Sequence, residues 1–118
     1  MAGRVLRYGA GEKIIEAGKV ERRMYIILDG SVEISLSDGK NAIRVATLKK
    51  GDFFGEISLF NSSPRSANAA AITDVAVAYL DNLQDLKTFL MKNPSFSAKM
   101  VHILAQRLAC LSKLLHQG

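Results

Sequence analysis

The residues best suited to bind a charged ligand lie in one short segment, GDFFGEISLFNSSPRSANAAA, at positions 51–71. Glu56 stands in an otherwise apolar run, and Arg65 follows nine residues later, directly after a proline. The planar guanidinium of an arginine donates in pairs to a phosphate. A carboxylate beside an anion would instead accept hydrogen bonds from a neighbouring hydroxyl. One such acceptor and one such donor together suit a sugar phosphate.

The residues around these two charges favour a tight backbone that can approach an anion. Gly55 permits unusual backbone angles, and the run EISLF is long enough for one short helical turn whose free amides attract negative charge. Ser66 and Ala67, directly after Arg65, offer a hydroxyl and close backbone approach. A simpler interpretation is an ion pair between Glu56 and Arg65 that only ties down a loop.

Length and composition indicate one soluble domain over residues 1–118, since 48% hydrophobic and 23% charged residues are ordinary for a globular protein. Cys110 is the single cysteine, which excludes an internal disulfide and a zinc site built from several thiolates of this chain. We therefore expect a cytoplasmic protein. No apolar run approaches the roughly 20 residues of a membrane span, and the N-terminus lacks the apolar core of a signal peptide.

The net charge of +5 is spread along the chain rather than clustered. After Asp85 there are no acidic residues, while five basic residues remain, namely Lys87, Lys92, Lys99, Arg107 and Lys113. Such a pattern is more typical of a solvated helical face than of a surface for an acidic partner.

Short strands and turns are predicted for the first 80 residues. Asp29-Gly30 separates two apolar runs, RRMYIILDG and SVEISLSDG, which predicts a hairpin because such a turn needs positive φ. A second Asp-Gly at 38–39 leads to the run AIRVATLKKGD, and DVAVAYLD is a further strand. The pattern predicts an antiparallel, jelly-roll-like β-roll at about 8–81.

Helices are predicted for the rest of the chain, at about 82–116. The run NLQDLKTFLMKN is helical in pattern, Pro94 interrupts it, and Ser95 can cap a second helix that continues to about His116. The predicted fold class is therefore mainly β with helices: a β-roll followed by C-terminal helices.

These motifs resemble the cyclic nucleotide-binding domain family, and the resemblance covers almost the whole chain. YGAGEKIIEAGK is similar to the opening strand and turn of that family, and MYIILDGSVEI to its glycine hairpin. GDFFGEISLF and PRSANAAA resemble its phosphate-binding cassette, which is the most specific part of the match. The resemblance implies a regulatory module that binds a 3',5'-cyclic purine nucleotide and catalyses no reaction.

The resemblance also implies a role for individual residues. The glutamate of the cassette binds the ribose 2'-hydroxyl, the arginine pairs with the cyclic phosphate, and backbone amides with a small hydroxyl residue complete the cradle. These roles fall on Gly55, Glu56, Ile57, Ser58, Arg65, Ser66 and Ala67. Val45 and Ala46 occupy the region that would pack on the sugar and base. Cyclic AMP is favoured over cyclic GMP, although a hydroxyl residue such as Ser66 favours guanine in some relatives.

Other functions find less support in the residues. No nucleophile elbow, zinc-protease pair or Walker loop occurs, so no enzyme activity is predicted. A metal-dependent jelly-roll enzyme would need clustered histidines on strands, whereas His102 and His116 lie far apart in the helical region, so no metal or cofactor is expected. A transcription regulator would need a helix-turn-helix after the long helix, and this chain has no such DNA-binding motif. The same fold sensing another anionic effector is a further alternative.

The long C-terminal helix has an apolar arc that is wider than packing on one roll requires. At about 100° per residue, one stripe is formed by Val101, Leu104, Leu108, Leu111 and Leu115. The stripe either packs on the domain itself or pairs with the same helix of a second subunit, which the family resemblance favours. Arg107 falls inside the arc and is a candidate lid contact to the purine.

Overall fold

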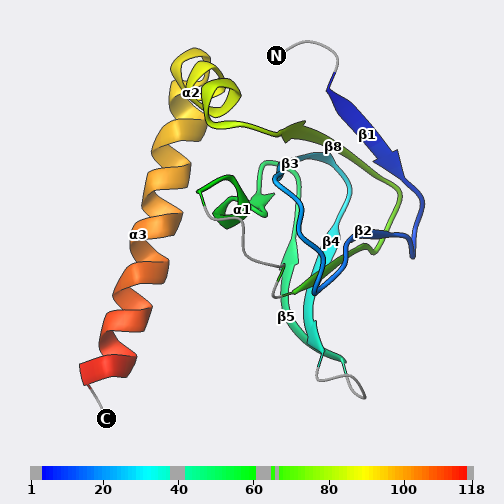
Figure 1. The fold of residues 1–118 in the computed structure, drawn as a ribbon, viewed down its shortest axis with the longest axis horizontal. Coiled ribbons are helices and arrows are strands. Elements are labelled where there is room, and N and C mark those ends of the chain that lie inside the picture. Colours follow the sequence, from blue (N-terminus) through cyan, green and yellow to red (C-terminus); the bar gives the residue numbers. More distant parts are fainter. Residues whose placement is uncertain (1–3, 38–41, 61–64, 66, 117–118) are drawn as a thin grey trace. The chain divides into compact units, whose positions relative to one another are not determined.

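Antiparallel strands build two sheets in the computed structural model, which describes residues 4–37, 42–60, 65 and 67–116 (Figure 1). The first sheet has the order β1-β8-β3-β6, formed by Val5–Tyr8, Val75–Leu80, Met24–Asp29 and Phe53–Phe54. The second has the order β2-β7-β4-β5, formed by Lys13–Ile15, Asn68–Ala71, Val32–Ser37 and Ala42–Leu48. All paired strands are antiparallel, which confirms the predicted roll. The first strand begins at Val5, slightly before the predicted start.

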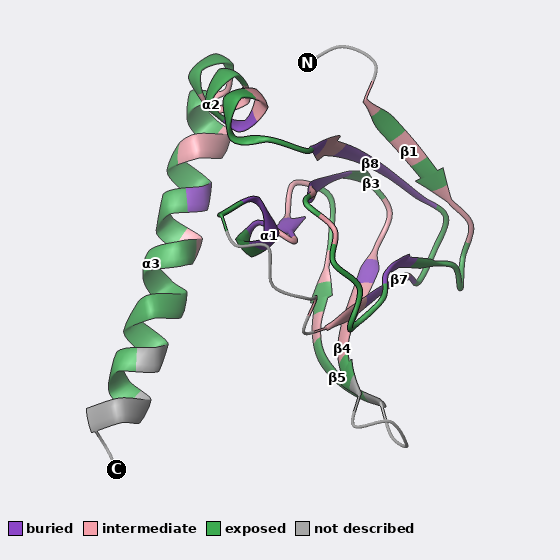
Figure 2. Cartoon of the chain, viewed as in Figure 1, coloured by how far each residue is buried: buried purple, intermediate pink, exposed green. Residues whose placement is uncertain are grey.

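Side chains from both sheets share one hydrophobic cluster, to which Tyr25, Ile27 and Val77 contribute from the first sheet and Val32 and Ala71 from the second. The ring of Tyr25 also stacks on Phe54, with the ring centroids 5.1 Å apart. The first four residues of β3 and nearly all of β8 are buried on both faces of the sheet, as the purple ribbon in Figure 2 shows, whereas Leu28 and Asp29 at the end of β3 are exposed. Burial on both faces explains why these two strands read as continuous apolar runs.

The first Asp-Gly turn does not form the predicted hairpin. Gly30 has the expected positive φ of 92°, but β3 and β4 belong to different sheets, so the chain crosses from one sheet to the other at this point. A Cβ atom at Gly30 would collide with the backbone oxygen of Asp74, in the connection between β7 and β8 that also changes sheets. The Ser31 N–H donates to the Thr73 hydroxyl over 3.1 Å. The glycine is therefore needed where two crossing connections meet. Strands β4 and β5 do pair with each other, and the second Asp-Gly between them lies outside the described residues.

Two compact units divide the chain, Met1–Leu86 and Lys87–Gly118, and the boundary falls inside helix α2 at Leu83–Lys92. The first unit contains both sheets and the short helix α1 at Ile57–Phe60. The prediction of one domain over residues 1–118 stays a prediction.

The second unit turns a corner between α2 and the long helix α3 at Pro94–His116. The Ser97 N–H donates to the Asn93 carbonyl over 3.0 Å, so Asn93 precedes the helix and Pro94 is its first residue. The predicted cap at Ser95 is therefore wrong, because proline is well suited to the first helical position. Phe89 and Phe96 pack edge to face across the corner, with centroids 5.2 Å apart.

The predicted apolar stripe of α3 is exposed where the structure describes it. Val101 and Leu108 are each 68% exposed, and Leu104 is 37% exposed. The side chains of Leu111 and Leu115 lie outside the described part of the chain. These exposed residues are available to a partner, and none is identified by the stripe alone.

Candidate functional site

The predicted cassette begins with a turn that only glycine fits well. Gly55 has a φ of 80°, a region that side chains disfavour. A Cβ atom at this position would lie 2.8 Å from the Arg23 carbonyl oxygen and 2.9 Å from Nη1 of Arg65. After this turn the chain forms α1, with the Ser58 N–H donating to the Gly55 carbonyl over 3.2 Å, which confirms the predicted helical turn. The missing side chain thus makes room for the guanidinium of Arg65.

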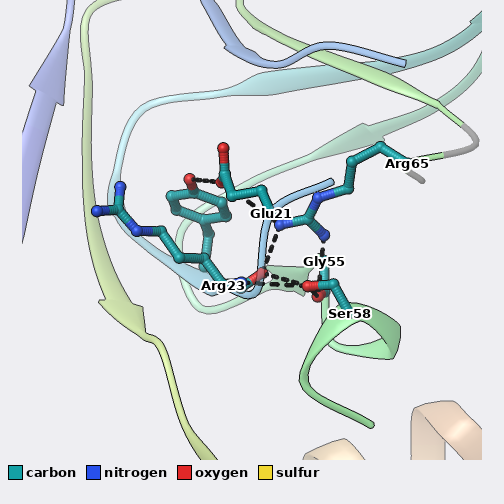
Figure 3. Close-up of polar contacts among 6 residues, drawn as sticks. Glu21, Arg23, Gly55, Ser58 and Arg65 are labelled. Atoms are coloured by element: carbon teal, nitrogen blue, oxygen red, sulfur yellow. Dashed lines mark hydrogen bonds and ion pairs between the residues drawn. The ribbon is translucent and has the colours of Figure 1, made fainter. Parts of the chain in front are cut away.

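Arg65 points into the first unit and its side chain is only 7% exposed. Figure 3 shows its guanidinium beside Gly55 and Arg23. Nη1 donates to the Gly55 carbonyl over 3.1 Å, and Nη2 donates to the Arg23 carbonyl over 2.7 Å. The Arg65 backbone is fixed as well, because its N–H donates to the carbonyl of Lys19 and its own carbonyl accepts the N–H of Gly18, both over 2.8 Å. These contacts hold the Arg65 guanidinium in a defined position that is nearly inaccessible to water.

The charge of Arg65 is only loosely balanced by an acid. Nη2 lies 3.5 Å from Oε1 of Glu21, whose side chain is 35% exposed. Within the described residues, the buried Nε of Arg65 has no hydrogen-bond partner. A buried cation is costly unless carbonyl dipoles or an anion surround it. The unused donor and the loose ion pair leave Arg65 able to bind a further anionic group.

Tyr25 connects Glu21 to the core of the roll. Its hydroxyl donates to Oε1 of Glu21 over 2.5 Å, the same oxygen that faces Arg65. Burial raises the pKa of the Tyr25 hydroxyl, and the neighbouring Glu21 carboxylate raises it further, so the hydroxyl keeps its proton and remains a donor.

The Ser58 hydroxyl contacts the same two carbonyl groups, those of Gly55 and Arg23. It lies 3.0 Å from the Arg23 carbonyl oxygen and 2.9 Å from that of Gly55, and it accepts the N–H of Arg23 over 3.2 Å. The Ser58 side chain is thus part of the scaffold that orients the acceptors of Arg65.

Glu56 is buried at the start of α1, with 6% of its surface exposed. Its Oε2 accepts the N–H of the next residue, Ile57, over 3.2 Å. Ile57 itself is 69% exposed. A buried carboxylate can accept a hydroxyl of a ligand, and this role stays a prediction.

The remaining predicted residues lie on different elements. Val45, which is 52% exposed, and the half-buried Ala46 lie on β5, and Ala67 directly precedes β7. Ser66 lies outside the described residues. Arg107 is exposed on α3 in the second unit, and its lid role stays a prediction.

Sequence reasoning missed three residues of this site, namely Glu21, Arg23 and Tyr25. Glu21 and Tyr25 lie more than 35 positions from Arg65, and Arg23 contacts Arg65 through its backbone carbonyl, which no side-chain pattern reveals. The guanidinium of Arg23 lies 4.4 Å from the ring centroid of Tyr79 and also interacts with the Tyr25 hydroxyl and Glu21. The charge run Glu21-Arg22-Arg23 before β3 was the available signal.

Two other features of the described residues bear on function. No group of three or more histidine, cysteine, aspartate or glutamate residues is arranged there as metal ligands would be. The helices in the same part of the chain are not long and apolar enough to cross a membrane.

Comparison with known proteins gives a consistent assignment. Residues 5–93 match the cyclic nucleotide-binding domain family. A cAMP-dependent protein kinase regulatory subunit from Colletotrichum orbiculare is 40% identical over 74 residues, which cover 63% of this chain and 18% of that protein. A CRP-like cAMP-activated global transcriptional regulator from Mycobacterium tuberculosis is 31% identical over 100 residues, covering 83% of this chain and 44% of the regulator.

Among solved structures, the catabolite activator protein of Thermus thermophilus is similar, with a TM-score of 0.77 and 27% identity. The similarity covers 94% of this chain and 52% of that protein chain. The chain thus spans less than half the length of the two curated relatives, and about half of the structural one.

Proposed function

The chain belongs to the cyclic nucleotide-binding domain family, and from this premise we propose that it binds a 3',5'-cyclic purine nucleotide, with cyclic AMP preferred over cyclic GMP. The observation that carries the proposal is Arg65, a buried cation with an unused donor and a loose acidic partner. A cyclic phosphate would supply the missing acceptor and a full negative charge.

The phosphate would approach the edge of the guanidinium formed by Nε and Nη2. Nε has no hydrogen-bond partner among the described residues, and Nη2 has its weaker contact, the 3.5 Å contact to Glu21, in addition to the bond to Arg23. Two parallel donors on one edge match two phosphate oxygens. The carbonyl groups that accept hydrogen bonds from Nη1 and Nη2 would keep the guanidinium in place while it binds the phosphate.

The sugar and base would occupy the adjoining residues. Glu56 would accept the ribose 2'-hydroxyl, and the amides of Gly55, Ile57 and Ser58 with Ser66 and Ala67 would complete the phosphate cradle. Val45 and Ala46 would pack against the sugar and base. The preference for cyclic AMP is supported by the fungal kinase regulatory subunit and the mycobacterial regulator, whose names state that they respond to cAMP.

We further propose that the module is regulatory rather than catalytic and that it acts through its C-terminal helix. Occupancy would change the order of α3, and the stripe of Val101, Leu104 and Leu108 would pair with the same helix of a second subunit. In that case Leu108→Glu reduces dimer formation, measured by sedimentation, more than it reduces nucleotide affinity. A strictly monomeric parent protein would remove the dimer from the proposal.

A second candidate is the sensor half of a transcription regulator, favoured by the mycobacterial relative that this chain covers only in part. The candidate shares the ligand and differs in its output. The DNA-binding part would then lie outside residues 1–118.

Isothermal titration of the protein with cyclic AMP, cyclic GMP and 5'-AMP tests the proposal. We expect saturable binding of one cyclic AMP per chain, weaker binding of cyclic GMP and the weakest binding of 5'-AMP, whose phosphate is not held in the ring. If neither cyclic nucleotide binds, the proposed function is rejected in favour of another effector, whether or not 5'-AMP binds.

A further inference from the structure

We propose that Glu21 is an internal counter-ion that competes with an anionic ligand for Arg65. The inference rests on the proposed function for the identity of the physiological anion, but its observations concern Glu21, Tyr25 and Arg65 alone. It adds to the site a residue that weakens binding, where the other residues strengthen it.

The first observation is the position of the Glu21 carboxylate. Its Oε1 lies 3.5 Å from Nη2 of Arg65 (Figure 3). Nη2 belongs to the same edge of the guanidinium as Nε, which has no hydrogen-bond partner in the described part of the chain. The other terminal nitrogen, Nη1, donates to the Gly55 carbonyl. An anion that binds Nε and Nη2 together would therefore come close to the Glu21 carboxylate.

The second observation is that Glu21 is retained near this edge by Tyr25. The hydroxyl of Tyr25 donates to Oε1 over 2.5 Å, and the Tyr25 ring is fully buried in the core. Without that bond, a carboxylate on a side chain that is 35% exposed would gain from turning toward water. The bond thus keeps a negative charge beside Arg65 at the cost of its own hydration.

The balance of charges then decides the sign of the effect. With no ligand bound, the Glu21 carboxylate partly compensates the buried guanidinium. The Arg23 guanidinium is a second cation that interacts with Glu21. With a phosphate bound at Arg65, the two anions still lie beside the same guanidinium in a poorly hydrated place, and their repulsion opposes binding. Removing the charge of Glu21 should therefore tighten anion binding, whereas removing a residue that merely orients Arg65 would weaken it.

Glu21→Gln is the direct test, because the amide retains the shape and an oxygen that can accept from Tyr25. We expect it to bind cyclic AMP about three- to tenfold more tightly than the parent protein. We also expect inorganic phosphate to raise its thermal unfolding midpoint more than it raises that of the parent. Both measurements use the full chain.

Glu16→Gln is the matched control. Glu16 lies in the same connection between β2 and β3, is 47% exposed and pairs with Lys19 over 3.3 Å rather than with Arg65. It removes the same charge from the same loop, so we expect less than about a twofold change in affinity. An equal gain in both variants would overturn the inference, because a general change in the charge of the loop would then explain it.

Tyr25→Phe tests whether the hydrogen bond from Tyr25 keeps Glu21 beside Arg65. It keeps the buried ring and removes only the hydroxyl, so we expect a smaller gain in affinity than for Glu21→Gln. The double variant should bind no more tightly than Glu21→Gln alone, because Tyr25 acts through the Glu21 charge. Additive gains would overturn this part of the inference.

The two phosphate probes separate this inference from the proposed function. If neither protein binds cyclic nucleotide but phosphate stabilises Glu21→Gln more than the parent, the proposed ligand is wrong and the counter-ion stands. Unchanged or weaker binding of cyclic AMP by Glu21→Gln in a parent that binds it overturns the counter-ion. So does the absence of any response of Glu21→Gln to phosphate.

Discussion

Arg65 and Arg4 both meet carboxylates in the first unit, but in opposite settings. Arg4 is 39% exposed, and its Nη1 lies 2.6 Å from Asp81 and 3.0 Å from Asp85. Arg65 is 7% exposed, and its carboxylate partner, Glu21, is 3.5 Å away. The exposed arginine thus has two close acids although water could solvate it, while the buried arginine has one distant acid among the described residues.

The difference indicates what each arginine does. Two close acids on an exposed cation connect the start of β1 to the end of β8 and the first turn of α2, which is a structural use of charge. A buried cation that relies mainly on the carbonyls of Gly55 and Arg23 is oriented but not neutralised. Such a cation is stable only at some cost, which an anionic ligand can offset.

The largest effects are expected when each arginine is removed in turn, which tests whether Arg65 binds the ligand and Arg4 does not. We expect Arg65→Ala to weaken cyclic AMP binding by about 2–4 kcal/mol, because the phosphate loses a buried cation. Arg4→Ala should leave the affinity unchanged. Titration calorimetry on both variants measures this.

Arg65→Lys refines the same test. An ammonium group cannot donate along a planar edge, so this variant should recover only part of the lost affinity. Equal affinities of Arg65→Ala and the parent protein would remove Arg65 from the site, and full recovery by lysine would show that charge alone matters.

Two glycines with similar φ values test whether the space beside Arg65 must stay free of a side chain. Gly55 and Gly11 have φ of 80° and 89°, but a Cβ atom at Gly11 meets nothing within 4 Å. We expect Gly11→Ala to cost about 1 kcal/mol of unfolding free energy, from the backbone alone. Gly55→Ala should cost about 2–3 kcal/mol and also weaken binding, because its Cβ would displace Arg65. Urea unfolding that gives equal losses for both variants would contradict this account.

Glu56 provides a smaller effect, on the sugar rather than the phosphate. We expect Glu56→Gln to weaken cyclic AMP binding by roughly 2 kcal/mol, less than Arg65→Ala, because a charge-assisted bond to the ribose hydroxyl is lost. The 2'-deoxy analogue should show little further loss on this variant, since either deletion removes the same contact. Fully additive losses would show that Glu56 does not touch the ribose.

The smallest expected effect concerns the stability contributed by Arg4. Its hydrogen bond to Asp81 lowers the pKa of that carboxyl group below the ordinary value of about 3.9. A lowered folded-state pKa gives stability that is present above about pH 4 and is lost as the pH falls through the folded value. Arg4→Ala should thus be slightly less stable than the parent at pH 7, and the difference should shrink as the pH falls through the folded-state pKa of Asp81. A difference in urea midpoint that stays the same at pH 7 and in acid would contradict this.

The sequence predicted the parts of the site that depend on local pattern. Gly55, the helical turn and Arg65 fall within one segment, so their types and spacing were enough to indicate an anion-binding turn. Glu21 and Tyr25 could not be found in that way, because Glu21 meets Arg65, and Tyr25 meets Glu21, only when β3 packs beside the cassette.

The prediction of the first hairpin was wrong for a related reason. Asp29-Gly30 predicted a positive φ, which the structure has, but the local pattern does not specify which sheet the next strand joins. That choice is made by distant residues, since the connection at Thr73 and Asp74 packs directly on Gly30. Local geometry was predictable, whereas the pairing of strands across the roll was not.

The Nε of Arg65, which has no hydrogen-bond partner among residues that the structure describes, allows a direct test of whether a phosphate binds this guanidinium. Nitrogen-resolved NMR of the arginine Nε–H groups, with Arg65→Lys used to assign the signal, can be recorded with and without cyclic AMP. We predict that the Arg65 Nε–H signal shifts and that its exchange with water slows when cyclic AMP is added, because the donor gains a phosphate oxygen. Saturable binding of cyclic AMP with an unchanged Arg65 Nε–H signal would contradict the claim.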